Sequence, residues 1–296
     1  MSTASAAELA DRRPAPAAAP LRRWLRLLRS ELRNVFLRPR NLLMLAVLGA
    51  APVFLGVVLK INTPPPGAGG GPGPGAFIGQ IADNGVFVAL FAIYVLTTVL
   101  LPLTVSVVSG DSVAGEAGLG TLRTLLTVPA GRTRLLATKY LMIVIFCFAA
   151  AGVVGGLGLL MGAILFPVGP VTLLSGATVS LADGLLRVLL ITCYVAIALS
   201  ALGAIGLALS TFSQHAIAVM VAVLVIVLIS EILDAIGQVA AIHPYLPTHF
   251  WFSFDALLRT PIDWASIVRG LASFAAYIVV FGTLAWVRML RADVTC

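Results

Sequence analysis

Charge is scarce in this sequence. Only 10% of its 296 residues are charged, and 60% are hydrophobic, which gives a mean hydropathy of +1.06. Soluble domains carry about 25% charged residues. A chain with so little charge cannot cover the surface of a water-soluble domain of this length, so the composition indicates an integral membrane protein.

Cysteines are few, and several common catalytic sequence motifs are absent. The three cysteines are scattered, and Cys147 and Cys193 lie inside apolar runs, so they predict neither a disulfide framework nor a zinc site. The sequence contains no G-x-x-x-x-G-K-[ST] phosphate loop, no H-E-x-x-H and no G-x-S-x-G. We therefore expect no catalytic residue, no metal ligand and no cofactor in this chain. An intramembrane enzyme stays open only as a second alternative.

The net charge of +7 does not indicate nucleic acid, because the arginines gather near one end and no aromatic-plus-basic RNA module accompanies them. What the sequence has in abundance is long apolar runs. A helix needs about 17–25 mostly apolar residues to cross a bilayer. Six runs qualify, and they predict an all-α polytopic membrane protein with six transmembrane helices: 41–59, 85–109, 136–166, 185–210, 216–235 and 265–287.

The positions of the basic residues predict the orientation. Fifteen of the 19 Lys and Arg residues precede the first run, lie between the second run and the first turn of the third, where Lys139 stands, or follow the last. Short cytoplasmic loops carry the excess of basic residues. We therefore expect a multi-pass protein of the cell membrane, inner or plasma, with both termini in the cytoplasm and a cytoplasmic tail at 288–296.

An amphipathic helix is predicted between a disordered arm at 1–20 and the transmembrane domain at 41–287. Within residues 21–40, apolar side chains recur at helical spacing and arginines fill the other positions, which is typical of a helix on the inner membrane surface. Pro39 should end it, because the residue before a proline disfavours helix. The apolar face comprises Leu21, Trp24, Leu25, Leu28, Leu32, Val35 and Phe36.

Two outer segments differ in composition. Residues 61–76 are rich in proline and glycine, and we assign them no chemistry. Residues 237–264 are aromatic, with Tyr245, Phe250, Trp251, Phe252 and Trp264 among them, and they fit either an interfacial belt or short re-entrant helices closing a pathway. His243 and His249 in this segment could meet across a turn and bind a metal, but the prolines beside them favour interfacial loop residues.

Acidic residues inside the spans are confined to the end of the fifth. Glu231 and Asp234 are three residues apart and share a helix face. They are either solvated end residues or an acidic patch lining an exit vestibule. Because the spans contain no ladder of charges, a proton- or ion-coupled carrier is not indicated, and energy for transport would have to enter from outside the membrane.

The segment 110–139 is the largest cytoplasmic surface apart from the N-terminal arm. Asp111 and Glu116 flank a Ser-Val-Ala-Gly turn, glycines then permit a change of direction, and Thr121 can cap a short helix. Four leucines share one apolar face of that helix before Pro129 ends it. The predicted coupling residues are Asp111, Glu116, Gly120, Thr121, Leu122, Arg123, Leu125, Leu126 and Pro129.

This segment, "GDSVAGEAGLGTLRTLLTVPAGRTRLLATKY", resembles the intracellular loop of permease subunits in ATP-binding cassette exporters of the type 2 class. The shared pattern is an acidic residue, Gly-Glu, Gly-Thr-Leu-Arg, Leu-Leu, Pro, a basic pair and a Lys. It is matched by Asp111, Gly115, Glu116, Gly120 to Arg123, Leu125, Leu126, Pro129, Arg132, Arg134 and Lys139. The layout of the rest of the chain agrees with that class.

The resemblance implies a coupling helix after Gly120, seated in a groove of a cytoplasmic ATPase, with the N-terminal helix packed beside it. It also implies two separate ATPase subunits, which bind ATP and Mg, and a second permease copy or homologue. The expected function is ATP-driven export of a hydrophobic or amphipathic substrate such as a drug, lipid or peptide. The alternative is a related subunit that senses or assembles without transporting.

Overall fold

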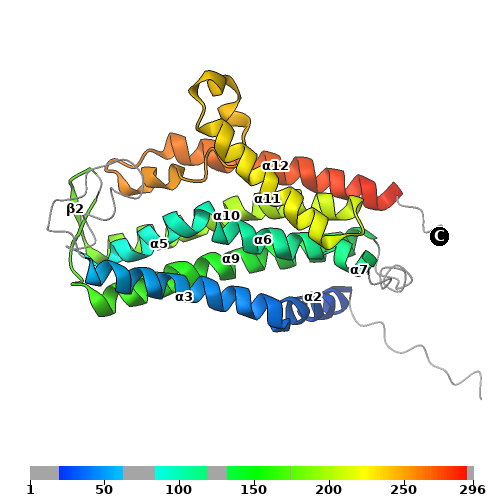
Figure 1. The fold of residues 1–296 in the computed structure, drawn as a ribbon, viewed down its shortest axis with the longest axis horizontal. Coiled ribbons are helices and arrows are strands. Elements are labelled where there is room, and N and C mark those ends of the chain that lie inside the picture. Colours follow the sequence, from blue (N-terminus) through cyan, green and yellow to red (C-terminus); the bar gives the residue numbers. More distant parts are fainter. Residues whose placement is uncertain (1–19, 63–83, 119–131, 174, 292–296) are drawn as a thin grey trace, which may run out of the picture.

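The fold is that of a computed structural model, which describes residues 20–62, 84–118, 132–173 and 175–291. Within these residues the chain is almost entirely helical (Figure 1). The α-helices are α2 (Pro20–Leu37), α3 (Pro39–Ile61), α5 (Val86–Thr98), α6 (Leu100–Asp111), α7 (Ala114–Gly118), α9 (Arg132–Leu165), α10 (Leu181–Phe212), α11 (Ala216–Asp234) and α12 (Trp264–Arg291).

Short elements complete the described chain. Two two-residue strands, β1 (Val171–Thr172) and β2 (Thr178–Val179), pair antiparallel between α9 and α10. Two 3-10 helices, η1 (Gly237–Tyr245) and η2 (Ser253–Leu258), lie between α11 and α12. The expected arm at 1–20, loop at 61–76 and tail at 288–296 fall largely outside the described residues.

Within the described residues, five helices are each long and apolar enough to cross a membrane: α3, α9, α10, α11 and α12. The pair α5 and α6 makes a sixth if it is counted as one bent span. These helices coincide with the six predicted runs to within a few residues. The protein is therefore an all-α, membrane-embedded polytopic protein.

The second span is not the straight helix that the run 85–109 suggested. α5 and α6 meet at an angle of 52°, and Val99 between them leaves the helical region, with φ −136° and ψ −55°. Pro102 explains the bend, because it has no N–H to donate to the carbonyl of Thr98 and its ring collides with the preceding turn.

The core forms around α10. Nearly three quarters of its apolar window, 72%, is buried, against 22% for α3 and α11 and 17% for α12. α10 packs against α9, α12 and α6. The outer helices keep wide apolar surfaces exposed, as helices do when one side faces lipid.

Glycines on α9 let neighbouring helices approach closely. A Cβ at Gly158 would lie 2.7 Å from the Cα of Ala89 on α5, and one at Gly49 of α3 would lie 2.9 Å from the side chain of Leu157. Gly156, on another side of α9, has nothing within 4 Å of such an atom. Small residues at helix contacts are the usual means of close packing in membranes.

The predicted helix before the first span is present as α2, and it ends where Pro39 required. Arg38 is extended, with φ −65° and ψ 127°, and Pro39 starts α3. The apolar face is only partly covered: Val35 is buried, Leu32 packs against the core, and Leu25 is 48% exposed. Trp24 donates a hydrogen bond of 3.1 Å from its indole N–H to the Thr138 hydroxyl on α9.

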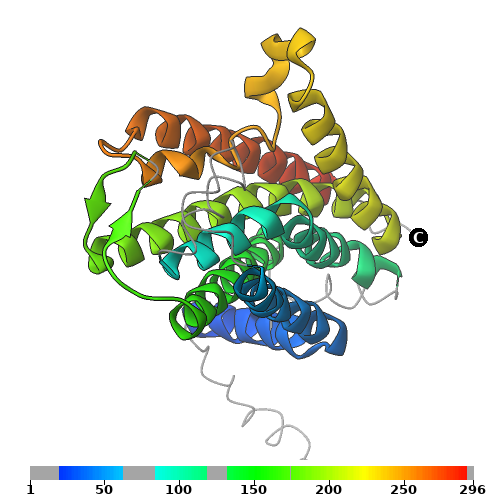
Figure 2. The ribbon, with the colours of Figure 1, turned by 60° about the vertical axis from the view of Figure 1, so that its left-hand side comes forward.

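The two ends of the bundle differ. Figure 1 shows α2, α7 and the last turns of α12 at one end, and the β1–β2 hairpin at the opposite end. The segment that follows α11 projects from the side of the bundle in both views (Figure 1, Figure 2). The polar groups described below lie in two separate regions, the α2 end of the bundle and the segment that follows α11.

Candidate functional site

A buried lysine joins three helices at the α2 end of the bundle. Lys139, in the second turn of α9, has a side chain only 1% exposed. Its ammonium group lies 2.6 Å from a carboxylate oxygen of Glu116 on α7 and 3.8 Å from one of Glu31 on α2. A buried ammonium requires such partners, so α2, α7 and α9 are held together by charge.

A second ion cluster lies beside the first. Arg38 and Arg40, at the junction of α2 and α3, both bind the carboxylate of Asp111, the last residue of α6, and the Arg40 contact measures 3.0 Å. Gly115 faces this carboxylate at such close range that a Cβ there would collide with it. The glycine of the Gly-Glu pair therefore has a steric role here.

A serine of α10 caps the start of α7. The Ser210 hydroxyl accepts hydrogen bonds from the backbone N–H groups of Val113 and Ala114, at 3.0 and 2.8 Å. It also donates to the carbonyl of Gly110 at 3.1 Å. Because the first N–H groups of a helix have no partner within it, one buried hydroxyl fixes the exit from α6 and the entry into α7.

These contacts place part of the predicted coupling segment. The expected turn after Asp111 is shorter than predicted, since the chain is already helical at Ala114–Gly118. Asp111 has its partners at the α2–α3 junction, and Glu116 has its partner on α9, the helix that follows the segment 119–131. The other predicted coupling residues, Gly120, Thr121, Leu122, Arg123, Leu125, Leu126 and Pro129, lie outside the described residues.

Sequence reasoning missed four members of this site: Glu31, Arg38, Arg40 and Ser210. Glu31 had a signal, because it is the only acidic residue within 20–40 and interrupts an otherwise basic helix. Ser210 had none, since a serine at the end of an apolar run reads as the start of a loop.

The bend in the second span opens a cavity of about 310 Å³ toward α11. One wall is the kink itself, at Thr98, Val99 and Pro102, and Glu231 of α11 lies on the opposite wall. The cavity lining is otherwise apolar. Glu231 therefore sits at a cavity, whereas Asp234, its predicted companion in an exit vestibule, contacts the segment beyond α11.

The segment 237–264 is anchored at several points. The buried Arg187 of α10 donates to the carbonyls of Leu257 and Arg259, the latter at 3.2 Å. Tyr194 donates to the carbonyl of Phe250 at 2.8 Å. Trp251 is 1% exposed, so this ring belongs to the core and not to an interfacial belt.

Aromatic rings elsewhere in the segment do face outward. Tyr245 is 78% exposed and Trp264 58%, as expected of rings at headgroup depth. Asp263 precedes α12 and caps it: its carboxylate accepts from the backbone N–H of Ala265 at 3.1 Å and from the Ser266 hydroxyl at 2.6 Å. The Ser266 hydroxyl lowers the pKa of Asp263 below its usual value.

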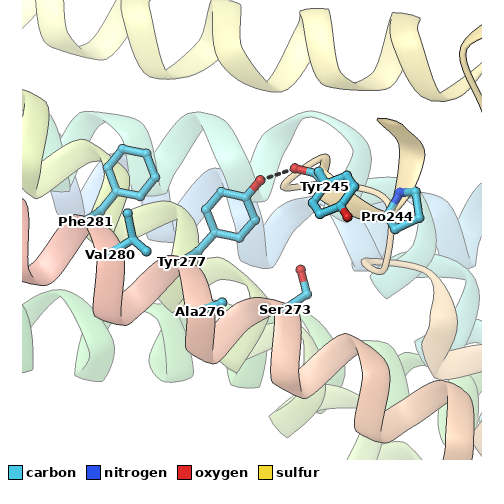
Figure 3. A pocket seen from close by; sticks show the side chains of 7 residues that line it. All are labelled: Pro244, Tyr245, Ser273, Ala276, Tyr277, Val280 and Phe281. Carbon is cyan, nitrogen blue, oxygen red and sulfur yellow. Dashed lines mark hydrogen bonds between the residues drawn. The ribbon is translucent and has the colours of Figure 1, made fainter. Parts of the chain in front are cut away.

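An apolar groove of about 340 Å³ lies between α12 and the end of η1. Figure 3 shows the side chain of Tyr277 on α12 pointing toward Tyr245, whose carbonyl accepts a hydrogen bond from the Tyr277 hydroxyl, while Phe281 lies beside Tyr277. The lining of the groove comprises Pro244, Tyr245, Ser273, Ala276, Tyr277, Val280 and Phe281.

Comparison with known proteins adds no assignment. Neither the protein-family models nor the curated proteins give a match to this chain. The class of protein established by the fold is therefore a polytopic helical membrane protein.

Proposed function

We propose that this chain is the membrane-spanning permease subunit of an ATP-binding cassette exporter of the type 2 class. Two separate cytoplasmic ATPase subunits would bind ATP and Mg and dock on the segment 111–134. A second copy or homologue of the chain would complete the pathway. The resemblance of the segment 110–140 to the intracellular loop of that class is the starting point.

The observation that carries the proposal is the set of ion pairs on both sides of the segment 119–131. Upstream, Asp111 binds Arg38 and Arg40 at the α2–α3 junction, and Glu116 binds Lys139 on α9. Downstream, Lys139 also pairs with Glu31 on α2. A force applied to the segment between them would reach α2, α6 and α9 together. This is the mechanical requirement for a coupling loop.

The two apolar cavities support a hydrophobic or amphipathic cargo. The cavity at the bend of the second span, about 310 Å³, is lined mainly by aliphatic side chains, with Glu231 as its one charged residue. Glu231 would face the cationic or hydroxyl part of an amphipathic substrate. The bend would change its angle during the transport cycle, since a proline kink lacks a hydrogen bond that would stiffen it.

The test is reconstitution of the full chain in liposomes with candidate ABC ATPase subunits from the same cell. We expect co-purification, and ATP hydrolysis that rises when an amphipathic substrate is added. Arg123→Glu should weaken ATPase binding, because a charged hydrogen bond across an interface is worth about 1.5–3 kcal/mol. Glu116→Gln should keep binding but lower the substrate stimulation, since it breaks the pair with Lys139.

Arg291→Glu is the matched control, because Arg291 is an exposed arginine at the same end of the bundle. Its binding and ATPase rates should equal those of the wild type. Wild-type values for both Arg123→Glu and Glu116→Gln would remove the coupling role. ATPase binding without any transported substrate would favour a sensor or assembly subunit, and hydrolytic activity of the isolated chain would favour an enzyme.

A further inference from the structure

Three side chains with metal-binding atoms converge where α11 ends. Asp234, the last residue of α11, lies 2.5 Å from Nδ1 of His249 and 3.7 Å from Nδ1 of His243, both measured to its Oδ1. One ligand atom from each of the three lies within 4.8 Å of the other two. All three residues are partly buried, so the cluster is sheltered and still reachable from solvent.

The orientation of His243 leaves a lone pair for an ion. Its Nε2 lies 3.2 Å from the carbonyl oxygen of Ile236, which can accept a hydrogen bond but cannot donate one. The neutral imidazole that satisfies this contact carries its proton on Nε2, so Nδ1 is unprotonated and faces Asp234. A histidine that binds a metal commonly donates its other N–H to a backbone carbonyl in this way.

His249 is held in place by its surroundings. Its ring packs edge-on against Phe250, with centroids 4.7 Å apart. Thr248, the preceding residue, is buried and its hydroxyl lies 2.7 Å from that of Ser230 on α11. The backbone that carries His249 is therefore tied to the helix that carries Asp234.

Two imidazoles and one carboxylate form the donor set of open zinc sites, in which three protein ligands leave a fourth position for water. Bonds of about 2.1 Å at tetrahedral angles place ligand atoms roughly 3.4 Å apart. The His243–Asp234 distance is near this value already, and the His249–Asp234 pair has to open by about 1 Å. That small movement is within the reach of side-chain rotation.

We propose that Asp234, His243 and His249 bind a divalent transition-metal ion of the zinc class at the outer end of α11. The ion ties the segment 237–249 to the helix and replaces the direct hydrogen bond between Asp234 and His249. The site does not depend on the proposed transport function. The two histidines, which the sequence analysis interpreted as interfacial loop residues, would then bind the same ion.

The experiment uses the full chain in detergent, purified through an affinity tag without histidine and stripped with a chelator. Titration calorimetry with Zn²⁺ alone should give one ion per chain, and Mg²⁺ should give no binding, because hard cations prefer all-oxygen sites. His249→Ala and His243→Ala should each weaken Zn²⁺ binding about 100-fold or more, since loss of an outer-shell partner alone costs about 10- to 100-fold.

His215→Ala is the matched control. His215 precedes the same helix, α11, at its opposite end, and its loss should leave the Zn²⁺ affinity unchanged. Melting in the presence of chelator checks the fold: all three variants should melt close to the wild type, and Zn²⁺ should raise the melting temperature of the wild type and His215→Ala alone.

A second readout locates the ion. Zn²⁺ should slow amide hydrogen exchange in the segment 237–249 of the wild type and not in His249→Ala. Absence of Zn²⁺ binding by the wild type would overturn the proposal and leave a hydrogen-bonded Asp-His pair. Equal binding by wild type, His243→Ala and His249→Ala would overturn it as well, because the ion would then sit elsewhere.

Discussion

At the scale of single residues, polar groups are used where backbone or charge would otherwise be left without a partner inside an apolar bundle. Lys139 is buried and therefore draws Glu116 and Glu31 to one point. The Ser210 hydroxyl forms hydrogen bonds with backbone groups between α6 and α7. Breaking a buried ion pair costs about 3–5 kcal/mol, so these few polar residues fix the arrangement of the helices that carry them.

Ser210→Ala should release the start of α7. The change leaves the N–H groups of Val113 and Ala114 without their acceptor, at a cost of about 1–3 kcal/mol. Hydrogen exchange at these two amides should accelerate, and the melting temperature in detergent should fall. Ser106→Ala is the control: this equally buried hydroxyl donates only to the Leu103 carbonyl of its own helix. Unchanged exchange in Ser210→Ala would show that the cap contributes nothing.

At the scale of helices, the positions of the glycines on α9 determine how closely α5 and α10 pack against it. Gly155, Gly158 and Gly162 face α10 or α5, and an added Cβ at each of them would meet atoms of the facing helix. Gly152 and Gly156 lie one turn apart on a face with open space. The glycines of one helix therefore divide into packing and non-packing positions.

Gly158→Val should destabilise the bundle, because the new side chain would collide with the backbone of α5 at Ala89. Overpacking of this kind costs typically about 1–3 kcal/mol, and a backbone neighbour cannot rotate away. Gly156→Val is the matched control, with the same change of helix propensity on the same helix. Thermal unfolding in detergent should separate the two variants; equal melting temperatures would contradict the close approach of α5 and α9.

Helix positions were the part of the fold that the sequence predicted well. The six apolar runs, the end of α2 before Pro39 and the boundary near Ser210 all have local causes, namely hydropathy and proline. The bend at Val99 was missed although Pro102 was visible, because a proline within a membrane helix is tolerated when neighbouring helices compensate. Which residues meet across helices, as Glu31 and Lys139 do, is decided by packing and carries no local signal.

In the candidate sites, too, local sequence patterns were predicted and contacts between helices were not. Asp111, Glu116 and Lys139 belong to one contiguous pattern in the sequence, but Arg38 and Arg40, the partners of Asp111, were not predicted. His243 and His249 were recognised as able to meet, and the outcome depended on Asp234, which the sequence grouped with Glu231 instead. Helix periodicity placed both acids on one face, yet only the fold decides which of them reaches the loop beyond α11.

At the scale of the whole molecule, the two ends of the bundle predict opposite sides of a membrane. The end with α2, α7 and the last turn of α12 carries Arg26, Arg29, Arg33, Arg38, Arg40, Arg288 and Arg291. The other end carries the β1–β2 hairpin and η2. Basic residues near the ends of spans favour the cytoplasmic side, so we expect α2 inside and the hairpin outside.

Cysteine labelling tests this orientation on a variant in which Cys147, Cys193 and Cys296 are replaced by alanine. Single cysteines at Gly169 and Gln238 should react with a membrane-impermeant maleimide added to intact cells. Single cysteines at Ser30 and Gln214 should react only after the membrane is opened. The wild-type residues at Gln238, Ser30 and Gln214 are exposed, and Gly169 has open space around it, so accessibility in the fold does not limit any of the four.

The four positions also test whether α5 and α6 together cross the membrane, because Ser30 and Gln214 lie on the same side only if an even number of spans separates them. If α5 and α6 formed a re-entrant hairpin and not one bent span, Ser30 and Gln214 would lie on opposite sides of the membrane. Only one of the two would then be labelled in intact cells. Labelling of Gln214 from outside in intact cells would place the base of α7, with Glu116 and Lys139, on the outer surface. A cytoplasmic ATPase could not then reach it, and the proposed coupling role would fall with the orientation.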